Sequence, residues 1–247
     1  MTTPRIVSRE DWLKARTNLL RQEKEFSRAR DALTAERGQM PWTKVTKPYV
    51  FETPTGPASL ATLFGPRGQL IVYHFMFHPD WSEGCKSCSL VADHYNPAVV
   101  HLNQRDVSLV TVSRAPLNKL LAFKARMGWT FPWVSSFGNE FNRDFNVSFT
   151  EAELERAETT YNYKVQKFPM PEAPGISVFA KSAEGEVFHT YSAYARGLEN
   201  FMGVYSLLDL VPKGRDEAGL GYVMQWVRHH DRYGGGDPHA ALAATRA

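Results

Sequence analysis

The chain of 247 residues has two cysteines, Cys85 and Cys88, which form a C-x-x-C pair in the stretch HPDWSEGCKSCSL. Such a pair can be a redox-active dithiol, half of a zinc site or two inert buried thiols. A zinc site would need two further ligands. The candidate ligands are His94, His101, His229, His230 and Asp231. Pro97 interrupts the spacing of the first two, and adjacent residues on a helix point different ways, so the zinc interpretation is the weaker one.

The segments around the cysteines favour redox chemistry. Residues 69–77 (QLIVYHFMF) predict a buried strand, and residues 85–103 predict a helix that Pro97 kinks or splits. A helix that begins at Cys85 directs its free amide N–H groups and its dipole at that sulfur, which stabilises a thiolate. Lys86 adds a positive charge. Cys85 is therefore the predicted nucleophile, and Cys88, almost one turn later, is the predicted resolving thiol.

The remaining pattern predicts the elements that hold this pair. Residues 107–113 read as a second buried strand, and residues 116–127 as a helix with Pro116 at its start. Residues 175–181 and 186–192 flank a turn and predict a hairpin, followed by a helix over 196–211. This β-α-β-α order predicts an α/β fold, with a central sheet flanked by helices. Thr150 and Glu153 predict a capping box on a short helix.

The N-terminal residues 9–37 predict one long helix with Ser8 as its cap. Trp12, Leu19, Phe26 and Leu33 recur every seven residues and form an apolar stripe on an otherwise charged helix. The stripe predicts either packing on the main domain or a dimer-forming arm. We divide the chain into this helical arm (1–41), the main domain (42–212) and a C-terminal helical extension (213–247), whose Gly-rich tail from Gly234 is predicted to be disordered.

Composition and hydropathy argue against several classes of function and location. The formal net charge is +3, and the basic residues are scattered, so a nucleic-acid surface is not predicted. No run of about 18 apolar residues predicts a membrane span. The first residues lack the apolar core of a secretory signal, so a cytoplasmic location is expected. In that reducing compartment a close cysteine pair is more often catalytic or metal-binding than structural.

Several motifs resemble known redox proteins. The predicted strand and helix order resembles the thioredoxin fold, and FETPTGPASLATLF looks like the entry segment of the peroxiredoxin and thiol-specific antioxidant branch. The stretches FHPDWSEGCKSCS, HLNQRDVSLVTVSRAP, MGWTFPWVSS and GRDE…WVRHHDRY resemble a bacterial family of thioredoxin-like proteins, the predicted dithiol-disulfide isomerases. This resemblance covers roughly residues 8–233.

The resemblance implies a site around the cysteine pair. Its supporting residues would be Trp81, Gly84, Lys86, Ser87, Pro174 and Arg114. Pro174 is the candidate for the cis-proline that faces the cysteines in thioredoxin-like proteins. The sequence departs from thioredoxin in two respects, because Gly84 replaces the Trp before the first cysteine and Lys-Ser separates the cysteines. Asp80 or Glu83 is a candidate proton acceptor for Cys88.

The predicted function is thiol-disulfide oxidoreduction or isomerisation by this dithiol, without a metal or organic cofactor. Its partners would be a protein or small-molecule disulfide and an electron-donating dithiol system, with dimerisation through the N-terminal helix. One alternative is a thiol peroxidase, in which Cys85 becomes a sulfenic acid that Cys88 condenses with. Another is a non-catalytic binding module with an aromatic groove, although dense aromatics are more often core. The groove candidates are Trp129, Phe131, Trp133, Phe137, Phe141 and Phe145.

Overall fold

The computed structural model describes residues 4–234 and divides into two units, Met1–Thr43 and Lys44–Ala247. The first unit consists mainly of α1 (Arg9–Gly38), as predicted, and Ser8 caps it by accepting a hydrogen bond from the Asp11 amide. No residue of α1 is buried. The apolar residues at seven-residue spacing are each between 46% and 69% exposed. Along the described residues no helix combines the length and hydrophobicity that crossing a membrane requires.

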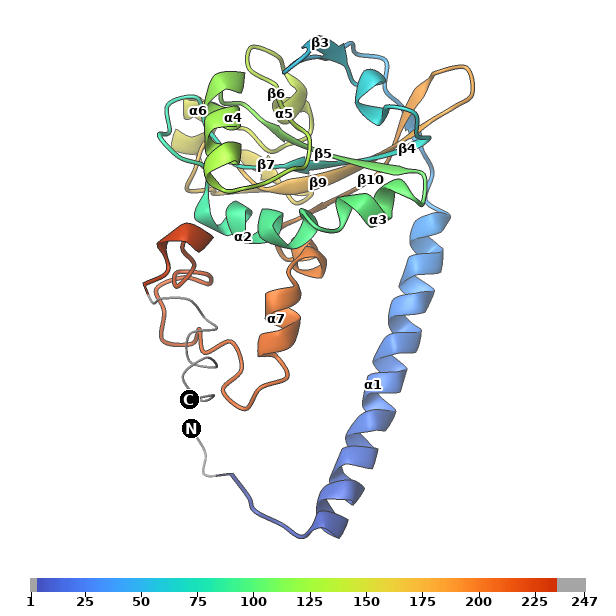
Figure 1. Ribbon diagram of the computed structural model, residues 1–247, viewed down its shortest axis with the longest axis vertical. Coiled ribbons are helices and arrows are strands. Elements are labelled where there is room, and N and C mark those ends of the chain that lie inside the picture. Colours follow the sequence, from blue (N-terminus) through green and yellow to red (C-terminus); the bar gives the residue numbers. More distant parts are fainter. Residues whose placement is uncertain (1–3, 235–247) are drawn as a thin grey trace, which may run out of the picture. The chain divides into compact units, whose positions relative to one another are not determined.

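The second unit is built on an eight-stranded sheet with the order β1-β10-β9-β4-β5-β6-β2-β3 (Figure 1). The strands are β1 (Thr43–Lys44), β2 (Val50–Thr53), β3 (Gly56–Ser59), β4 (Gln69–His74), β5 (Val107–Ser113), β6 (Trp133–Ser135), β9 (Gly175–Lys181) and β10 (Val187–Tyr194). A separate pair contains β7 (Thr159–Tyr161) and β8 (Lys164–Gln166).

The centre of this sheet has the thioredoxin topology. β4 and β5 are parallel neighbours, β9 pairs antiparallel with β4 on its other side, and β10 pairs antiparallel with β9. The helix α2 (Lys86–Tyr95) connects β4 to β5, α4 (Leu117–Arg126) follows β5, and α7 (Gly203–Leu208) follows β10. The predicted thioredoxin-like α/β fold is therefore confirmed. The continuous apolar runs of β4 and β5 are needed because both faces of these strands are covered.

Two cores cover the two faces of the sheet. Tyr73 and Leu109 face a core formed with α2, α4 and α7, whereas Leu70, Val72 and Val110 face a second core. β4, β5 and β6 are parallel and adjacent in chain order, and right-handed crossovers then place α2 and α4 on the same face. This arrangement brings the start of α2 and the body of α4 together at the carboxyl edge of β4.

Local signals predicted several boundaries correctly. The helix over 85–103 is split at the predicted place into α2 and α3 (Val99–Asn103), and Pro97 lies between them. The short helix α6 (Glu151–Glu155) carries the predicted capping box of Thr150 and Glu153. The strand over 69–77 ends at His74 in β4, although Phe75 and Phe77 still make backbone hydrogen bonds to Val112 and Ala115.

Other predictions were wrong in detail. The helix expected over 196–211 is a 3-10 helix, η2 (Ala195–Phe201), followed by the shorter α7. The extension from 213 to the last described residue, Gly234, contains turns and a 3-10 helix, η3 (His230–Arg232), rather than an α-helix. Glycines and two residues at positive φ, Asp216 and Met224, break regular structure there. The predicted disordered tail lies outside the described residues apart from Gly234.

Five of the six groove candidates belong to the cores. Trp129, Phe131 and Trp133 pack in the core that contains α2, whereas Phe141 at the start of α5 (Phe141–Asp144) and Phe145 pack in the other. All five are buried, and Phe137 is 49% exposed. They are therefore core residues, although Trp133 also lines a cavity that the β2–β3 region borders. The cysteine region is the candidate site.

Candidate functional site

The cysteines lie where the chain leaves β4 and enters α2. Cys85 is the N-cap of α2, and its amide donates a 3.0 Å hydrogen bond to the carbonyl of Met76, which closes the intervening loop onto the end of β4. Cys85 is partly exposed and Cys88 is 2% exposed. The predicted placement of the pair at a helix N-terminus is therefore found in the structure.

Gly84 is a glycine because its surroundings leave no room for a side chain. A Cβ atom there would lie 2.6 Å from Cε1 of Phe75 and 3.0 Å from Cε1 of Phe123. Both rings belong to the buried core beneath the loop. The departure from thioredoxin, which has Trp before the first cysteine, therefore follows from the way these two rings fill the space under Cys85.

The two thiols have opposite acidities. Both are free, and the two cysteines approach to 3.8 Å. A hydrogen bond from Cys88 lowers the pKa of Cys85 to about 7, and the amides of Cys88 and Ser87 and the charge of Lys86 act in the same direction against burial. Burial raises the pKa of Cys88 well above its ordinary value, and the neighbouring Cys85 raises it further. Cys85 is thus the more acidic of the two thiols, and Cys88 donates a hydrogen bond to it.

Tyr73 is a site residue that sequence reasoning missed. Its ring is 1% exposed, and its hydroxyl is buried without a hydrogen-bond partner within the described part of the chain. The hydroxyl and Cys88 are close enough for each to shift the pKa of the other. The neighbouring Tyr95 differs, because its hydroxyl is bonded to Thr111 at 2.6 Å. The available signal was a tyrosine on an inward position of an apolar strand.

Arg114 and Pro174 were predicted as supporting residues of the site, and the structure shows their contacts. Arg114 donates a 3.0 Å hydrogen bond to Glu172, which also accepts one of 2.6 Å from Ser148. Glu172 is 1% exposed, and burial raises its pKa to about 7 against the effects of Ser148 and Arg114. Pro174 has a trans peptide bond, since residues 4–234 contain no cis bond, and its carbonyl accepts a hydrogen bond from Tyr161. The prediction of a cis peptide bond at Pro174 was therefore wrong.

Trp81 lies in the loop before the cysteines and packs partly against the core that contains Cys88. Lys119 of α4 holds this loop through hydrogen bonds to the carbonyls of Pro79 and Trp81, at 2.6 and 3.3 Å. Of the two candidate proton acceptors in this loop, Asp80 is 89% exposed at its side chain. Glu83 is engaged in ion pairs with Arg126 and Arg232. Neither carboxylate is shown to contact Cys88.

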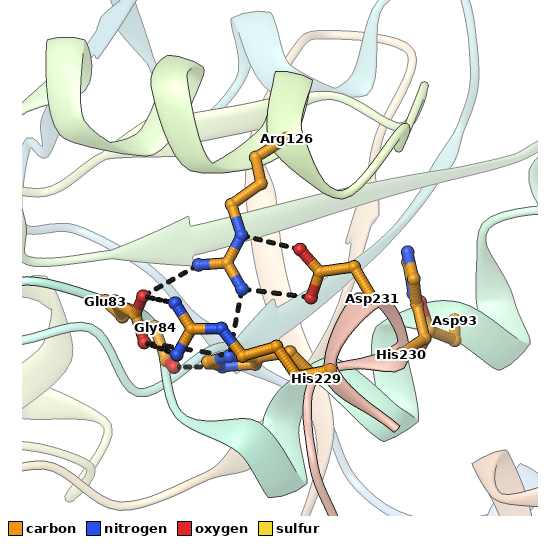
Figure 2. Close-up of polar contacts among 8 residues, drawn as sticks. Glu83, Gly84, Asp93, Arg126, His229, His230 and Asp231 are labelled. Carbon is orange, nitrogen blue, oxygen red and sulfur yellow. Dashed lines mark hydrogen bonds and ion pairs between the residues drawn. The ribbon is translucent and has the colours of Figure 1, made fainter. Parts of the chain in front are cut away.

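Residues 222–232, here called the C-terminal clasp, pack against the start of α2. Figure 2 shows Arg126 of α4 between Glu83 of the loop and Asp231 of the clasp, with hydrogen bonds of 2.8 Å to Glu83 and 2.8 and 2.9 Å to Asp231. His229 is 7% exposed and donates through Nε2 to the carbonyl of Gly84 at 2.9 Å. The clasp therefore fixes the residue directly before Cys85.

A cavity of about 570 Å³ is lined by residues of the loop before α2, by the first residue of α2 and by the clasp. Its lining consists of Asp80, Trp81, Ser82, Glu83, Gly84, Lys86, Arg228, His229 and Arg232. Another cavity, of about 410 Å³, is lined by residues of the sheet and of the β2–β3 region and includes none of the cysteine loop. No group of three or more His, Cys, Asp or Glu side chains among the described residues is arranged to hold a metal ion.

Comparison with solved structures finds bacterial peroxiredoxins of low sequence identity. Peroxidoxin BcpB from Mycobacterium tuberculosis is 15% identical, with 66% of this chain and 94% of that chain covered and a TM-score of 0.44. The bacterioferritin comigratory protein of Xanthomonas campestris is 18% identical, with 66% and 96% covered and a TM-score of 0.42. A PrxQ variant from Xylella fastidiosa is 14% identical, with 68% and 97% covered and a TM-score of 0.42.

Sequence comparison places the chain in a family. No curated protein matches it. One family model matches residues 1–233, which is nearly the whole chain and agrees with the extent of the bacterial resemblance described above. The description of that family includes no activity, so isomerase activity stays a prediction. The chain belongs to the family described as "Bacterial protein of unknown function (DUF899)".

Proposed function

We propose that this protein is a thiol-disulfide oxidoreductase in which Cys85 is the nucleophile and Cys88 the resolving thiol. One observation carries the proposal: two cysteines of opposite acidity meet at the N-terminus of α2, where the lower-pKa thiol is the partly exposed one. A thiolate near neutral pKa is the optimum attacking group at physiological pH. The buried, protonated partner is protected from direct attack by solvent-borne disulfides.

The reaction proceeds in two exchanges. The Cys85 thiolate attacks one sulfur of a substrate disulfide, forming a mixed disulfide and releasing one substrate thiolate, which takes up a proton. Cys88 then loses its proton and attacks the Cys85 sulfur, which forms the Cys85–Cys88 disulfide and releases the second thiol. Two electrons pass from the protein dithiol to the substrate disulfide. An external dithiol reduces the Cys85–Cys88 disulfide and becomes a disulfide itself.

Substitution of each cysteine tests this order. Reduced wild-type protein mixed with a small disulfide should lose both thiols and decrease in mass by about 2 Da, the signature of an internal disulfide in mass spectrometry. Cys88→Ser should stop at a stable mixed disulfide on Cys85, and Cys85→Ser should form neither product. Ser87→Ala is the matched control, because it changes a side chain between the cysteines and leaves both sulfurs. Adduct formation on Cys88 in the Cys85→Ser variant at the wild-type rate would overturn the assignment.

A thiol peroxidase is the second candidate, favoured by the partial exposure of a thiolate that has a resolving partner 3.8 Å away. In that reaction the Cys85 thiolate attacks a peroxide oxygen, forming a sulfenic acid and releasing water or an alcohol. Cys88 then condenses with the sulfenic acid and releases water. Stopped-flow mixing with hydrogen peroxide and with a small disulfide separates the two candidates, because the substrate class that oxidises Cys85 faster identifies the reaction.

A further inference from the structure

The cavity at the C-terminal clasp is lined by the residues on either side of Cys85. Gly84 and Lys86, the residues before and after Cys85, both line it. Its volume of about 570 Å³ lies within the range of small-molecule sites in proteins. Trp81 gives it an aromatic wall. A small substrate in this cavity would therefore lie against the two residues that flank Cys85 in the chain.

The acidic residues of the cavity wall do not neutralise all of its cations. Glu83 is bound by Arg126 at 2.8 Å and by Arg232 at 2.9 Å. Asp231, outside the wall, binds the remaining donors of Arg126. These four residues form a closed network in which two guanidinium groups meet two carboxylates, which leaves Lys86 and Arg228 outside it. The other carboxylate of the wall, Asp80, also lies outside the network, is 89% exposed at its side chain and lies 3.6 Å from His78.

Lys86 and Arg228 point at the same carbonyl oxygen. Lys86 Nζ and Arg228 Nη1 each donate a 3.0 Å hydrogen bond to the carbonyl of Gln225, and Arg228 Nη1 also donates to the carbonyl of Val227 at 3.1 Å. Because both nitrogens touch one oxygen, they lie within about 6 Å of each other, a range at which like charges repel. Within residues 4–234 neither cation has an ion pair with a carboxylate.

We propose that this cavity binds the carboxylate of a small anionic disulfide, held between Lys86 and Arg228 so that the disulfide bond reaches Cys85. The inference rests on the proposed function and adds the substrate class to it. A carboxylate between the two cations removes their repulsion, and the guanidinium of Arg228 has free donors whose geometry matches a carboxylate. Lys86 then has two effects, since it binds the carboxylate in the cavity and its charge helps to lower the pKa of the adjacent Cys85.

Three small disulfides of different charge test the proposal. Their leaving thiols differ in pKa, so each rate constant is divided by that of the same disulfide with a free small-molecule thiol, and these normalised rates are the ones compared. Reduced protein is mixed with 3,3′-dithiodipropionate, bis(2-hydroxyethyl) disulfide or cystamine, which are anionic, neutral and cationic, and the second-order rate constant of thiol loss is measured at low salt. The anionic disulfide should react at least about tenfold faster than the cationic one, and this ratio should fall as salt is added. Equal rates for all three would overturn the proposal.

Variants of Arg228 test whether the cavity causes this preference for an anionic disulfide. Arg228→Gln should lower the anionic-to-neutral rate ratio about tenfold, and Arg228→Glu should reverse the preference toward cystamine. Arg105→Gln is the matched control, because Arg105 is an exposed cation in the turn that precedes β5 and is absent from the cavity wall. An unchanged ratio in Arg228→Gln would overturn the cavity as the anion site. If none of the three disulfides oxidises the wild-type cysteines, the proposed function itself fails, and the two failures are thereby distinguished.

Discussion

Cys85 and Cys88 differ in reactivity because one sits at the helix end and the other inside the core. The pKa of Cys85 is lowered to about 7 chiefly by the hydrogen bond from Cys88 and less by Lys86. We predict that alkylation of Cys85 by iodoacetamide, followed against pH by mass spectrometry, has its midpoint near pH 7. Cys88→Ala should move this midpoint up more than Lys86→Gln does. A wild-type midpoint at the free-thiol value of about 8.5 would contradict the assignment of Cys85 as the thiolate.

Tyr73 is placed to assist the second exchange. Burial and the neighbouring Cys88 keep its pKa well above the ordinary value, so the hydroxyl stays protonated and can donate to the Cys88 sulfur when that thiol ionises. In a reaction with a disulfide of nitrothiobenzoate, one nitrothiobenzoate is released when Cys85 attacks and a second when Cys88 resolves the mixed disulfide. We predict that Tyr73→Phe slows the second release several-fold and leaves the first unchanged. The variant should fold normally, since the lost hydroxyl has no partner among the described residues.

Tyr95→Phe is the control for that experiment. It removes the hydroxyl bonded to Thr111 and leaves Tyr73 intact. Its second release should keep the wild-type rate, and a loss of stability of about 1 kcal/mol is expected from the broken hydrogen bond. Equal slowing in both variants would show that core packing, and not the Tyr73 hydroxyl, sets the rate.

At the scale of elements, the loop before α2 is held by close packing of its backbone. Gly84→Ala places a methyl group 2.6 Å from the Phe75 ring, so the ring or the loop must move. Overpacking of this kind costs about 1–3 kcal/mol in the free energy of unfolding. Urea denaturation should show this loss, whereas Gly219→Ala, where a Cβ meets nothing within 4 Å, should stay within about 0.5 kcal/mol of wild type. A stable Gly84→Ala variant would mean that the loop is loosely packed.

At the scale of the whole molecule, acid should weaken the second core through His74. This side chain is 0% exposed, bonds Ser177 at 2.9 Å, and has its pKa lowered by burial from 6.5 to about 3. Above pH 6.5 both the folded and unfolded states hold a neutral imidazole, and the full stability is present. Between pH 6.5 and 3 only the unfolded chain takes up the proton, so the free energy of unfolding falls by about 1.4 kcal/mol per pH unit.

Denaturation of wild type and His74→Gln at several pH values checks this effect. Burial lowers the pKa of His189 as well, so part of the slope in the same direction should remain in the variant. The variant should be less stable at pH 7.5, because a packed ring is lost, and its stability should depend less steeply on pH between 6.5 and 4.5. Parallel curves for the two proteins would contradict the role of His74.

The first unit carries a prediction of its own. The apolar stripe of α1 is exposed along the whole helix, and Leu19 and Phe26 at its centre are 50% and 69% exposed. Self-association through the stripe would bury these side chains. Sedimentation analysis should then show a concentration-dependent dimer that Phe26→Glu converts to monomer, while Lys24→Glu on the charged face does not. A wild-type monomer at every concentration would refute the dimer-forming arm.

Sequence reasoning succeeded where the deciding interactions are local. The apolar runs of β4 and β5, the break at Pro97 and the capping box of α6 all depend on residues within a few positions of one another. It failed in the extension after residue 213, because turns with positive φ at Asp216 and Met224 replace the expected helix, and the clasp within this extension contacts α2 and α4. The ion pair of Arg114 with Glu172 likewise depends on a neighbour distant in sequence.

The sequence by itself determined the α/β order and the position of a C-x-x-C pair at a helix start, because hydrophobic periodicity and residue spacing specify these directly. The thioredoxin-like fold followed from the resemblance, and the helix start already indicated Cys85 as the more acidic thiol. Only the tertiary structure decided that a hydrogen bond from Cys88 is the chief cause of that acidity, that Tyr73 faces Cys88 and that residues 222–232 cover the site. Acidity depends on burial and on hydrogen bonds across space. Lys86 and Arg228 bind the same carbonyl oxygen although they lie 142 positions apart in the sequence, and no local pattern encodes such an arrangement.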